Sequence, residues 1–262
     1  MGAMPSRIDV DRVAVPAFGL AEDHEPFDGD WHAHDRHQLL FAAKGTLVLT
    51  TDEQRWTLPP ERAAWIGRKV RHRAASSTGV ELRTVYLTSS LAGRGALGSV
   101  RVFGVNSLAR EMLLYAMRWG PHDREYTPLA DAYFRALGAL AREWIADERP
   151  YHLPVAKSAG LAKAMAWVDA NLGDATVERA AEAAKVSVRT LSRRFEEETS
   201  TSFRAYLQGA RMMRAMELLA RRDASVSSTA HAVGFQSIGA FTTAFTERCG
   251  ETPSAYRARR MT

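Results

Sequence analysis

The sequence predicts an α+β protein in which a β-rich N-terminal part is followed by a helical connector and an all-α domain of tandem helix-turn-helix units. Three observations support this fold class. Short β-rich runs occur before about residue 104, helical periodicity follows, and the last hundred residues contain an internal repeat. We expect the domains to be 1–104, the connector and linker 105–157, and the helix-turn-helix domain 158–262.

The composition is that of an ordinary globular protein. Of 262 residues, 46% are hydrophobic and 25% are charged, which excludes collagen-like and disordered chains. The apolar stretches are shorter than a membrane helix needs, and the first residues lack the apolar core of a signal peptide. One cysteine, Cys249, cannot form an internal disulfide, so we expect a reducing, cytoplasmic compartment. Residues 158–262 contain 15 basic and 11 acidic residues, which favours a polyanionic partner.

The first part of the chain is expected to form an antiparallel barrel or sandwich. Turn residues at 44–45, 52–53, 59–60 and 76–79 separate its β-rich runs, which are 38–43, 46–51, 63–66 and 80–87. After residue 107 the apolar residues follow helical spacing and form one stripe, made of Leu129, Tyr133, Leu137, Leu140 and Trp144. This stripe either forms a dimerisation helix or packs against its own β domain. Two prolines then predict a linker at 148–154.

The internal repeat has an offset of 49 to 50 residues and the pattern of a helix-turn-helix. In each copy a helix with two small residues is followed by a short turn, a serine able to cap the next helix, and an inward i,i+4 apolar pair. The first copy has Ser187, Leu191 and Phe195 at these positions, and the second has Ser237, Phe241 and Phe245. Between the copies, 203–220 is expected to form one helix of about 18 residues, roughly 27 Å long at 1.5 Å per residue.

The outward side of the second helix differs between the two copies. In the first copy it carries Arg189 and Arg193, and an arginine can bond both O6 and N7 of guanine. The alternative is that Arg193–Glu197 and Arg194–Glu198 are surface ion pairs. The capped, repeated context favours base contact for Arg189 and Arg193, and a phosphate contact or an ion pair for Arg194. The second copy has Gly239 and Thr243 at the equivalent positions, so the first copy is expected to supply most sequence discrimination.

Residues from about 160 to 260 resemble the DNA-binding domain of the AraC/XylS family of transcriptional regulators. The resemblance rests on SVRTLSRRF (187–195), GFQS (234–237), FTTAF (241–245), Gly250 and PSAYR (253–257). It implies that each second helix enters the major groove of promoter DNA. The resulting DNA-binding set is Ser187, Arg189, Thr190, Ser192, Arg193, Arg194, Gln236, Ser237, Ile238, Gly239, Thr242 and Thr243. Many family members have arginine where Thr243 stands, and Thr229 replaces a larger aliphatic residue.

The N-terminal part is similar to the cupin-type sensor domains that are joined to this DNA-binding domain, which implies a cupin-like β-barrel. The similarity rests on WHAH (31–34), Gln38, Gly45, WTLPP (56–60), AAWI (63–66) and His72. Metal-binding cupins have H-x-H-x₃-E-x₆-G and a later histidine, so a divalent metal would have His32, His34, Gln38 and His72 as ligands. Gln38 replaces the usual carboxylate. These histidines alternatively pack in the barrel or bond an organic effector. His37 is expected at the surface, and His24 is expected to have no special role.

Four aromatic residues either line an effector pocket or fill the core of the β domain: Phe41, Trp56, Trp65 and Tyr86. The resemblance as a whole predicts a DNA-binding transcriptional regulator that senses a small molecule or a metal and is not an enzyme. Its expected partners are promoter DNA, RNA polymerase for an activator, and a second copy of the chain, with nucleoid association when DNA is bound.

Two other functions fit parts of the sequence. A metal-dependent cupin enzyme with an accessory helical domain is the first, but Gln38 and the lack of another acid/base cluster argue against it. An architectural DNA-binding protein without a sensing role is the second, and comparable affinity for random and specific DNA would favour it.

Overall fold

The protein consists of two compact units, one formed by residues 1–47 and 58–150 and the other by 48–57 and 151–262. The computed structural model describes residues 8–93, 98–123, 125–146, 152–219, 221 and 224–258. Each unit has a hydrophobic core of its own. Among the described helices, none is both long enough and apolar enough to cross a bilayer.

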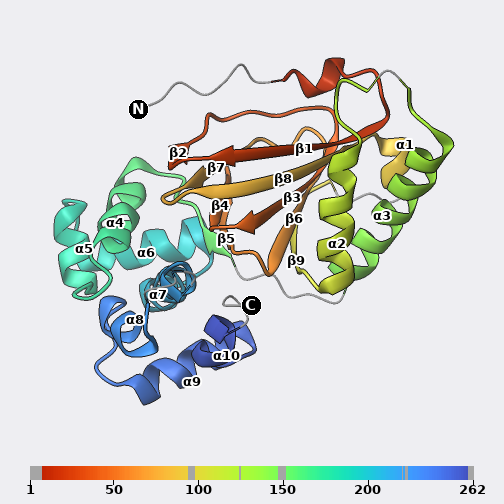
Figure 1. Ribbon diagram of the computed structural model, residues 1–262. Coiled ribbons are helices and arrows are strands. Elements are labelled where there is room, and N and C mark those ends of the chain that lie inside the picture. Colours follow the sequence, from red (N-terminus) through yellow and green to blue (C-terminus); the bar gives the residue numbers. More distant parts are fainter. Residues whose placement is uncertain are drawn as a thin grey trace. The chain divides into compact units, whose positions relative to one another are not determined.

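A five-stranded antiparallel sheet forms the centre of the first unit, in the order β1-β8-β3-β6-β9 (Figure 1). Its register places Gln38 of β3 opposite Tyr86 of β8 and Ile66 of β6. The short strands β2 and β7 pair with each other. The strands of this unit are β1 (Ala17–His24), β2 (Phe27–Asp28), β3 (His37–Lys44), β6 (Arg62–Ile66), β7 (His72–Ser76), β8 (Val80–Leu87) and β9 (Val100–Gly104). They confirm the strands predicted at 38–43, 63–66 and 80–87.

The two faces of this sheet have different environments because side chains alternate along each strand. On one face, Phe41, Trp65 and Val85 belong to an apolar cluster with Phe134 and Leu137 of α3. The helices α2 and α3 cover this face (Figure 1). The opposite face borders a cavity. The helical elements of the unit are η1 (Val10–Arg12), α1 (Ser89–Ala92), α2 (Ser107–Tyr115), η2 (Ala116–Arg118) and α3 (Pro128–Ala146).

The buried face of α3 differs from the stripe that the sequence predicts. Of the predicted stripe, only Leu137 is fully buried. Leu129 is 60% exposed, and Tyr133, Leu140 and Trp144 are only partly buried. The buried row is Ala130, Phe134, Leu137, Ala141 and Ile145. Both rows are apolar, so periodicity alone does not determine which one packs on the sheet. Of the predicted linker 148–154, residues 148–151 lie outside the described residues.

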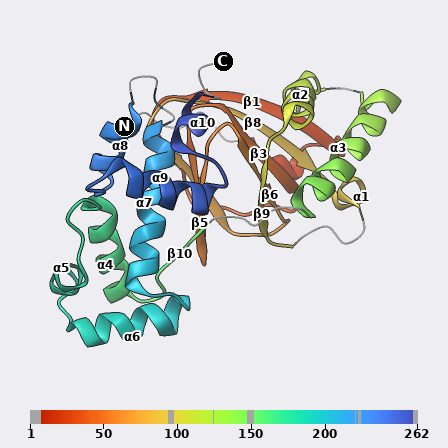
Figure 2. The same ribbon diagram turned by 90° about the horizontal axis from the view of Figure 1, so that it is seen from below.

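The second unit contains seven helices within its described residues, and Figure 2 shows α7 running from the α4–α6 group to the α8–α10 group. One core joins both groups, and Phe195, Tyr206, Met212, Phe241 and Phe245 are buried in it. The 17-residue α7 is about 26 Å long; Ala220, its predicted last residue, lies outside the described residues. The helices are α4 (Ala159–Ala170), α5 (Val177–Ala183), α6 (Val188–Thr199), α7 (Phe203–Leu219), α8 (Val226–Ala232), α9 (Ile238–Cys249) and α10 (Pro253–Ala258).

The sequence repeat is also a repeat of backbone conformation. Lys185 ends the turn after α5 with a φ of 56°, and Gly234, 49 residues later, has a φ of 84° after α8. The helices α6 and α9 end in the same way, at Ser200 (φ 52°) and Gly250 (φ 78°). Glycine is needed at Gly234, because a Cβ there would lie 2.8 Å from the Cα of Gly173. The predicted tandem helix-turn-helix units are therefore confirmed as α5–α6 and α8–α9.

The segment 48–57, which holds most of β4 (Leu47–Thr51) and β5 (Gln54–Leu58), belongs to the second unit. In that unit β5 pairs with β10 (Leu153–Pro154). Arg55 donates from Nη1 to Oδ2 of Asp169 at 2.7 Å, and Tyr206 donates to Oδ1 of the same carboxylate at 3.1 Å. Burial disfavours the charged guanidinium, but Asp169 outweighs this effect and raises the pKa of Arg55.

Candidate functional site

Helix α6 is fixed at its start by a cap and along its inner side by two core residues. Ser187 accepts a hydrogen bond from the backbone N–H of Thr190 at 3.1 Å, as the sequence predicts. Leu191 and Phe195 are both fully buried. The outward side chains of the helix are therefore held in a defined direction, which base recognition requires.

The outward row of α6 is polar and basic at the N-terminal end of the helix. Arg189, Ser192 and Arg193 are exposed, and Thr190 is partly exposed with its hydroxyl 2.9 Å from that of Ser187. Arg193 donates to both carboxylate oxygens of Glu197, at 3.2 and 3.3 Å. Both alternatives for Arg193 therefore remain compatible with the structure, since the pair is exposed and can open.

Arg194 lies on the inner side of α6. It is partly buried, and it packs so closely on Gly160 of α4 that a Cβ there would overlap its guanidinium. Its neighbour Glu198 accepts hydrogen bonds from the backbone of Lys157 and Ser158, at 3.0 and 2.8 Å. Burial opposes ionisation of Glu198, but the hydrogen bonds from Ser158 and Lys157 and the charge of Arg194 lower its pKa. In this structure Arg194 thus helps to join α6 to α4.

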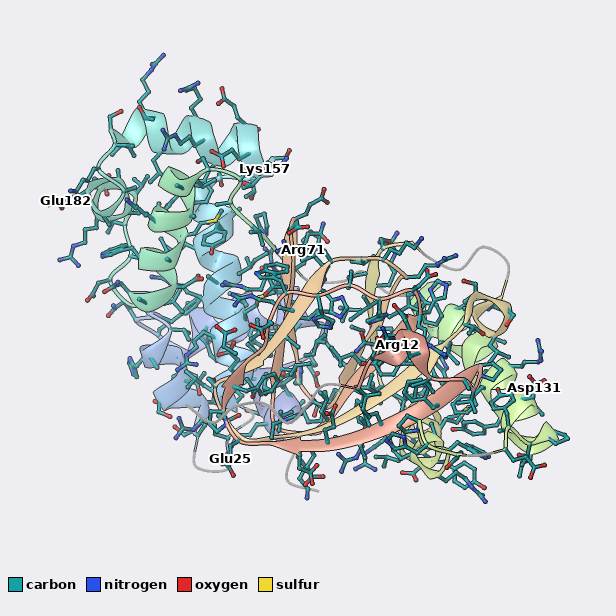
Figure 3. All side chains as sticks on the ribbon, turned by 90° about the horizontal axis from the view of Figure 1, so that it is seen from above. Arg12, Glu25, Arg71, Asp131, Lys157 and Glu182 are labelled. Atoms are coloured by element: carbon teal, nitrogen blue, oxygen red, sulfur yellow. The ribbon has the colours of Figure 1, made fainter. Side chains whose placement is uncertain are left out.

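Charge distinguishes α6 from the preceding helix of the same unit. Helix α5 carries two exposed carboxylates, Glu178 and Glu182, and one exposed arginine, Arg179; Figure 3 shows Glu182 pointing outward. Carboxylates repel a phosphate backbone, whereas the arginines at the start of α6 attract it. Of these two helices, the N-terminal half of α6, whose charged side chains are all basic, is therefore better suited to a polyanion.

The equivalent surface of α9 is uncharged. Ser237 caps the helix by accepting from the N–H of Ala240 at 3.1 Å, and Phe241 and Phe245 are fully buried. Of the predicted contact residues, Gln236, Ser237, Ile238, Gly239 and Thr243 are exposed and Thr242 is partly exposed. Ile238 is 46% exposed and places a methyl-rich surface at the start of the helix.

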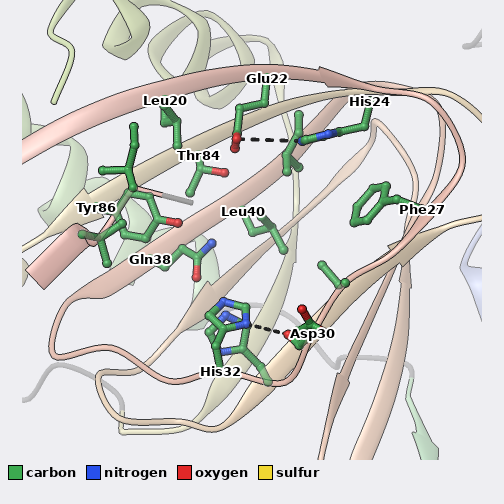
Figure 4. A pocket seen from close by; sticks show the side chains of 16 residues that line it. Leu20, Glu22, His24, Phe27, Asp30, His32, Gln38, Leu40, Thr84 and Tyr86 are labelled. Carbon is green, nitrogen blue, oxygen red and sulfur yellow. Dashed lines mark hydrogen bonds and ion pairs between the residues drawn. The ribbon is translucent and has the colours of Figure 1, made fainter. Parts of the chain in front are cut away.

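The first unit contains a cavity of about 90 Å³ on the sheet face opposite α2 and α3 (Figure 4). This volume is well below the roughly 300–1,000 Å³ of pockets for drug-sized ligands, so the cavity suits an ion or a small molecule. Apolar residues such as Leu20, Phe27 and Leu40 form part of its wall. Its polar lining residues are Glu22, His24, Asp30, His32, Gln38, His72, Thr84 and Tyr86.

The structure brings together the three histidines that the sequence singles out. Ligand nitrogens of His32, His34 and His72 all lie within 4.8 Å of one another. Ring centroids are 4.2 Å apart for His32 and His72 and 5.3 Å apart for His34 and His72. Gln38 extends from β3 toward His32 (Figure 4), and its Oε1 lies 3.0 Å from Nε2 of His34.

Of the four aromatic residues considered for a pocket, the structure places only Tyr86 in the cavity wall. Phe41 and Trp65 lie in the core beneath α3, because strand alternation directs them away from Gln38 and Leu40. Trp56 is buried near His152, with ring centroids 6.0 Å apart. These three residues are core residues and do not line this cavity.

Two histidines differ from their expected places. His37 is 2% exposed and packs against Trp65, so the expectation of a surface position is wrong; α3 and its neighbours cover that face of the sheet. Burial lowers the pKa of His37, and the charge of Arg68 lowers it further. His24 lines the cavity 4.0 Å from Glu22. The alternation Leu20, Glu22, His24 along β1 is the sequence signal that would have identified this part of the wall.

Two family models match this chain, one in its N-terminal part and one in its C-terminal part. Residues 16–154 match the AraC-like ligand binding domain, and residues 180–259 match a helix-turn-helix domain. The HTH-type transcriptional regulator NimR of Escherichia coli K12 is 27% identical over 254 residues, which span 95% of this chain and 89% of NimR. The HTH-type transcriptional activator RhaS of Escherichia coli O139:H28 is 24% identical, with 86% of each chain covered. A crystal structure of ToxT from Vibrio cholerae with a bound unsaturated fatty acid aligns with 92% of this chain and 94% of ToxT at 12% identity, with a TM-score of 0.38.

A ligand-binding β domain joined to a tandem helix-turn-helix domain defines a DNA-binding transcriptional regulator. The chain belongs to the AraC family, since its ligand-binding domain model alone covers more than half of the sequence.

Proposed function

We propose that this regulator recognises its promoter mainly through α6, with Arg189 and Arg193 at guanine edges in the major groove and Thr190 and Ser192 beside them. The observation that carries the proposal is the exposed basic row of α6, which lies opposite the fully buried Leu191 and Phe195. Arginine is the side chain most often used for specific guanine contacts. The hydroxyl of Ser187 lies at the start of the same helix, where phosphate contacts are common.

In this proposal α9 contributes fit and backbone contacts more than base discrimination. Ile238 and the methyl groups of Thr242 and Thr243 can contact thymine methyls, while Gln236 and Ser237 can donate to phosphates. The lack of a cation at Gly239 and Thr243 supports this division of roles. Arg194 is assigned to the α4–α6 contact, or at most to a phosphate.

We further propose that the cavity of the first unit binds the effector and that the protein acts on transcription without catalysing a reaction. Its small volume and its polar lining favour a small, polar effector. RNA polymerase would be a partner if the regulator activates transcription. A cytoplasmic location, with nucleoid association on DNA binding, follows from these roles.

A homodimer is the proposed assembly, through the apolar surface of α2 and α3. Leu108, Tyr115 and Leu129 are 54%, 49% and 60% exposed there. A second copy of the chain is the proposed partner because one α6 helix offers few base contacts, and a dimer doubles the number of base contacts. Sedimentation equilibrium would give a dimer mass that Leu129→Glu shifts toward the monomer; a monomer mass at every concentration would contradict this assembly.

The test of promoter recognition is a fluorescence anisotropy titration of the full chain with its own upstream DNA and with a scrambled duplex at physiological salt. A sequence-specific regulator is expected to prefer its site by about a thousandfold or more. The proposal would be contradicted if no segment of the upstream region is bound more tightly than the scrambled duplex. This must hold both without and with cellular extract, which is added as a source of effector.

A further inference from the structure

A backbone bridge holds two of the three clustered histidines next to each other. His32 and His72 form an antiparallel bridge in which each N–H donates to the carbonyl of the other at 2.9 Å. His34 lies two residues after His32, on the same side of an extended chain. His34 and His72 are 7% and 2% exposed, so two of the three imidazoles are almost completely removed from solvent.

Each of the three rings is oriented by a backbone carbonyl. The Nδ1 atoms of His32, His34 and His72 lie 3.0, 2.9 and 2.8 Å from the carbonyl oxygens of Asp30, Arg36 and Val70. A carbonyl oxygen only accepts, so each Nδ1 carries a proton and, in the neutral ring, each Nε2 carries a lone pair. This carbonyl–imidazole arrangement is the one that fixes the tautomer and direction of metal-bound histidines.

Gln38 supplies a fourth electron-pair donor. Its Oε1 is 3.0 Å from Nε2 of His34, where two lone-pair atoms face each other. A cation bound by both atoms removes the repulsion; without a cation, either the amide turns so that its nitrogen donates, or His34 carries a second proton and donates from Nε2. Three imidazole nitrogens and one amide oxygen form a donor set suited to a first-row divalent metal such as Zn²⁺.

We propose that His32, His34, His72 and Gln38 form a binding site for a zinc-type divalent cation inside the first unit. Four neutral ligands leave the charge of the ion uncompensated within its ligand set, and the carboxylates of Glu22 and Asp30 line the same cavity. Since His32, Gln38 and His72 also line the cavity, a small molecule that binds the ion would occupy it. The site rests on this geometry and not on the DNA contacts proposed for α6.

Equilibrium dialysis of the full, tag-free chain tests the site. The protein is first stripped with a chelator and then dialysed against Zn²⁺, and the bound metal is measured by mass spectrometry. We expect one ion per chain, lost in His34→Ala and His72→Ala and retained in His122→Ala, a matched change at an exposed histidine outside the cluster. Co²⁺ in place of Zn²⁺ is expected to give a visible absorption band that the same two variants abolish.

Gln38→Glu provides a test that does not depend on losing a buried histidine. The substitution introduces the carboxylate that a cation prefers, so competition with a chelating dye is expected to show tighter zinc binding than in the wild type. Wild-type protein without stoichiometric metal, equal metal in His34→Ala, or unchanged affinity in Gln38→Glu would each overturn the proposal. No DNA is needed, so a negative result leaves promoter recognition by α6 standing.

Discussion

Replacement of Arg193 by alanine is expected to weaken binding to the specific site without destabilising the protein. Arg193 and Glu197 have side-chain exposures of 64% and 56%, so their ion pair contributes only about 0.3–0.5 kcal/mol to the helix. A good arginine–guanine contact provides about 1–3 kcal/mol of discrimination. The 1–3 kcal/mol of such a contact corresponds to a loss of affinity of roughly 5- to 150-fold at the specific site. The loss for scrambled DNA should be much smaller.

The control is Arg135→Ala, which removes the same charge from a similar exposed i,i+4 pair on α3. Arg135 and Asp131 lie 2.6 Å apart with exposures of 56% and 37%, and Figure 3 shows Asp131 on the outer side of its helix. Anisotropy titrations at physiological salt give both affinities, and thermal melts give both stabilities. Unchanged affinity and unchanged preference in Arg193→Ala, or equal losses in Arg193→Ala and Arg135→Ala, would refute the assignment of Arg193 to a base.

Three further predictions concern the second unit and can be checked by chemical denaturation. Ser187→Ala removes the cap of α6 and should lower the free energy of unfolding by about 0.5–2 kcal/mol; no change would mean that the cap is not formed in solution. Thr229→Val should stabilise the protein by about 1 kcal/mol, because the buried Oγ1 of Thr229 has no hydrogen-bond partner among the described residues. A destabilised Thr229→Val variant would show that this hydroxyl is in fact satisfied. Glu198→Gln should destabilise at neutral pH, and because the folded-state pKa of Glu198 lies below its ordinary 4.5, the difference from the wild type should shrink below pH 4.5 and vanish below the folded pKa. A difference that is independent of pH would contradict the role of the ionised carboxylate.

The helical part of the fold could be predicted from the sequence because its signals are local. Serine caps and i,i+4 apolar pairs fix where α6 and α9 begin and which side they bury. The positive φ of Gly234 agrees with its residue type, but Lys185 adopts the same conformation against its residue preference, so the sequence carries no local signal for it. The four residues of the proposed metal site could also be predicted from the sequence, since alternation places His32 and His34 on one side.

The assignments that failed depend on which of two apolar surfaces a distant element covers. Alternation along β3 separates Gln38 and Leu40 from His37 and Phe41, but it does not state which side α3 covers. Alternation therefore does not decide whether Phe41 lines a pocket or lies in the core. For the same reason the expectation of a surface position for His37 is wrong, because the side chain is buried. On α3 itself two neighbouring apolar rows compete, and only packing against the sheet selects the row of Phe134. Non-local packing of this kind leaves no periodic signal in a single sequence.

Arg193 of α6 is proposed to contact a guanine edge in the major groove, and promoter recognition depends most on this contact. It is tested most directly by replacing single guanines of the specific site with 7-deazaguanine, which lacks the N7 acceptor, and measuring the affinities of wild type and Arg193→Ala. At least one such replacement is expected to weaken DNA binding by the wild type while leaving that of Arg193→Ala unaffected, as expected for a pair of interacting groups. Equal losses for both proteins at every guanine would contradict it.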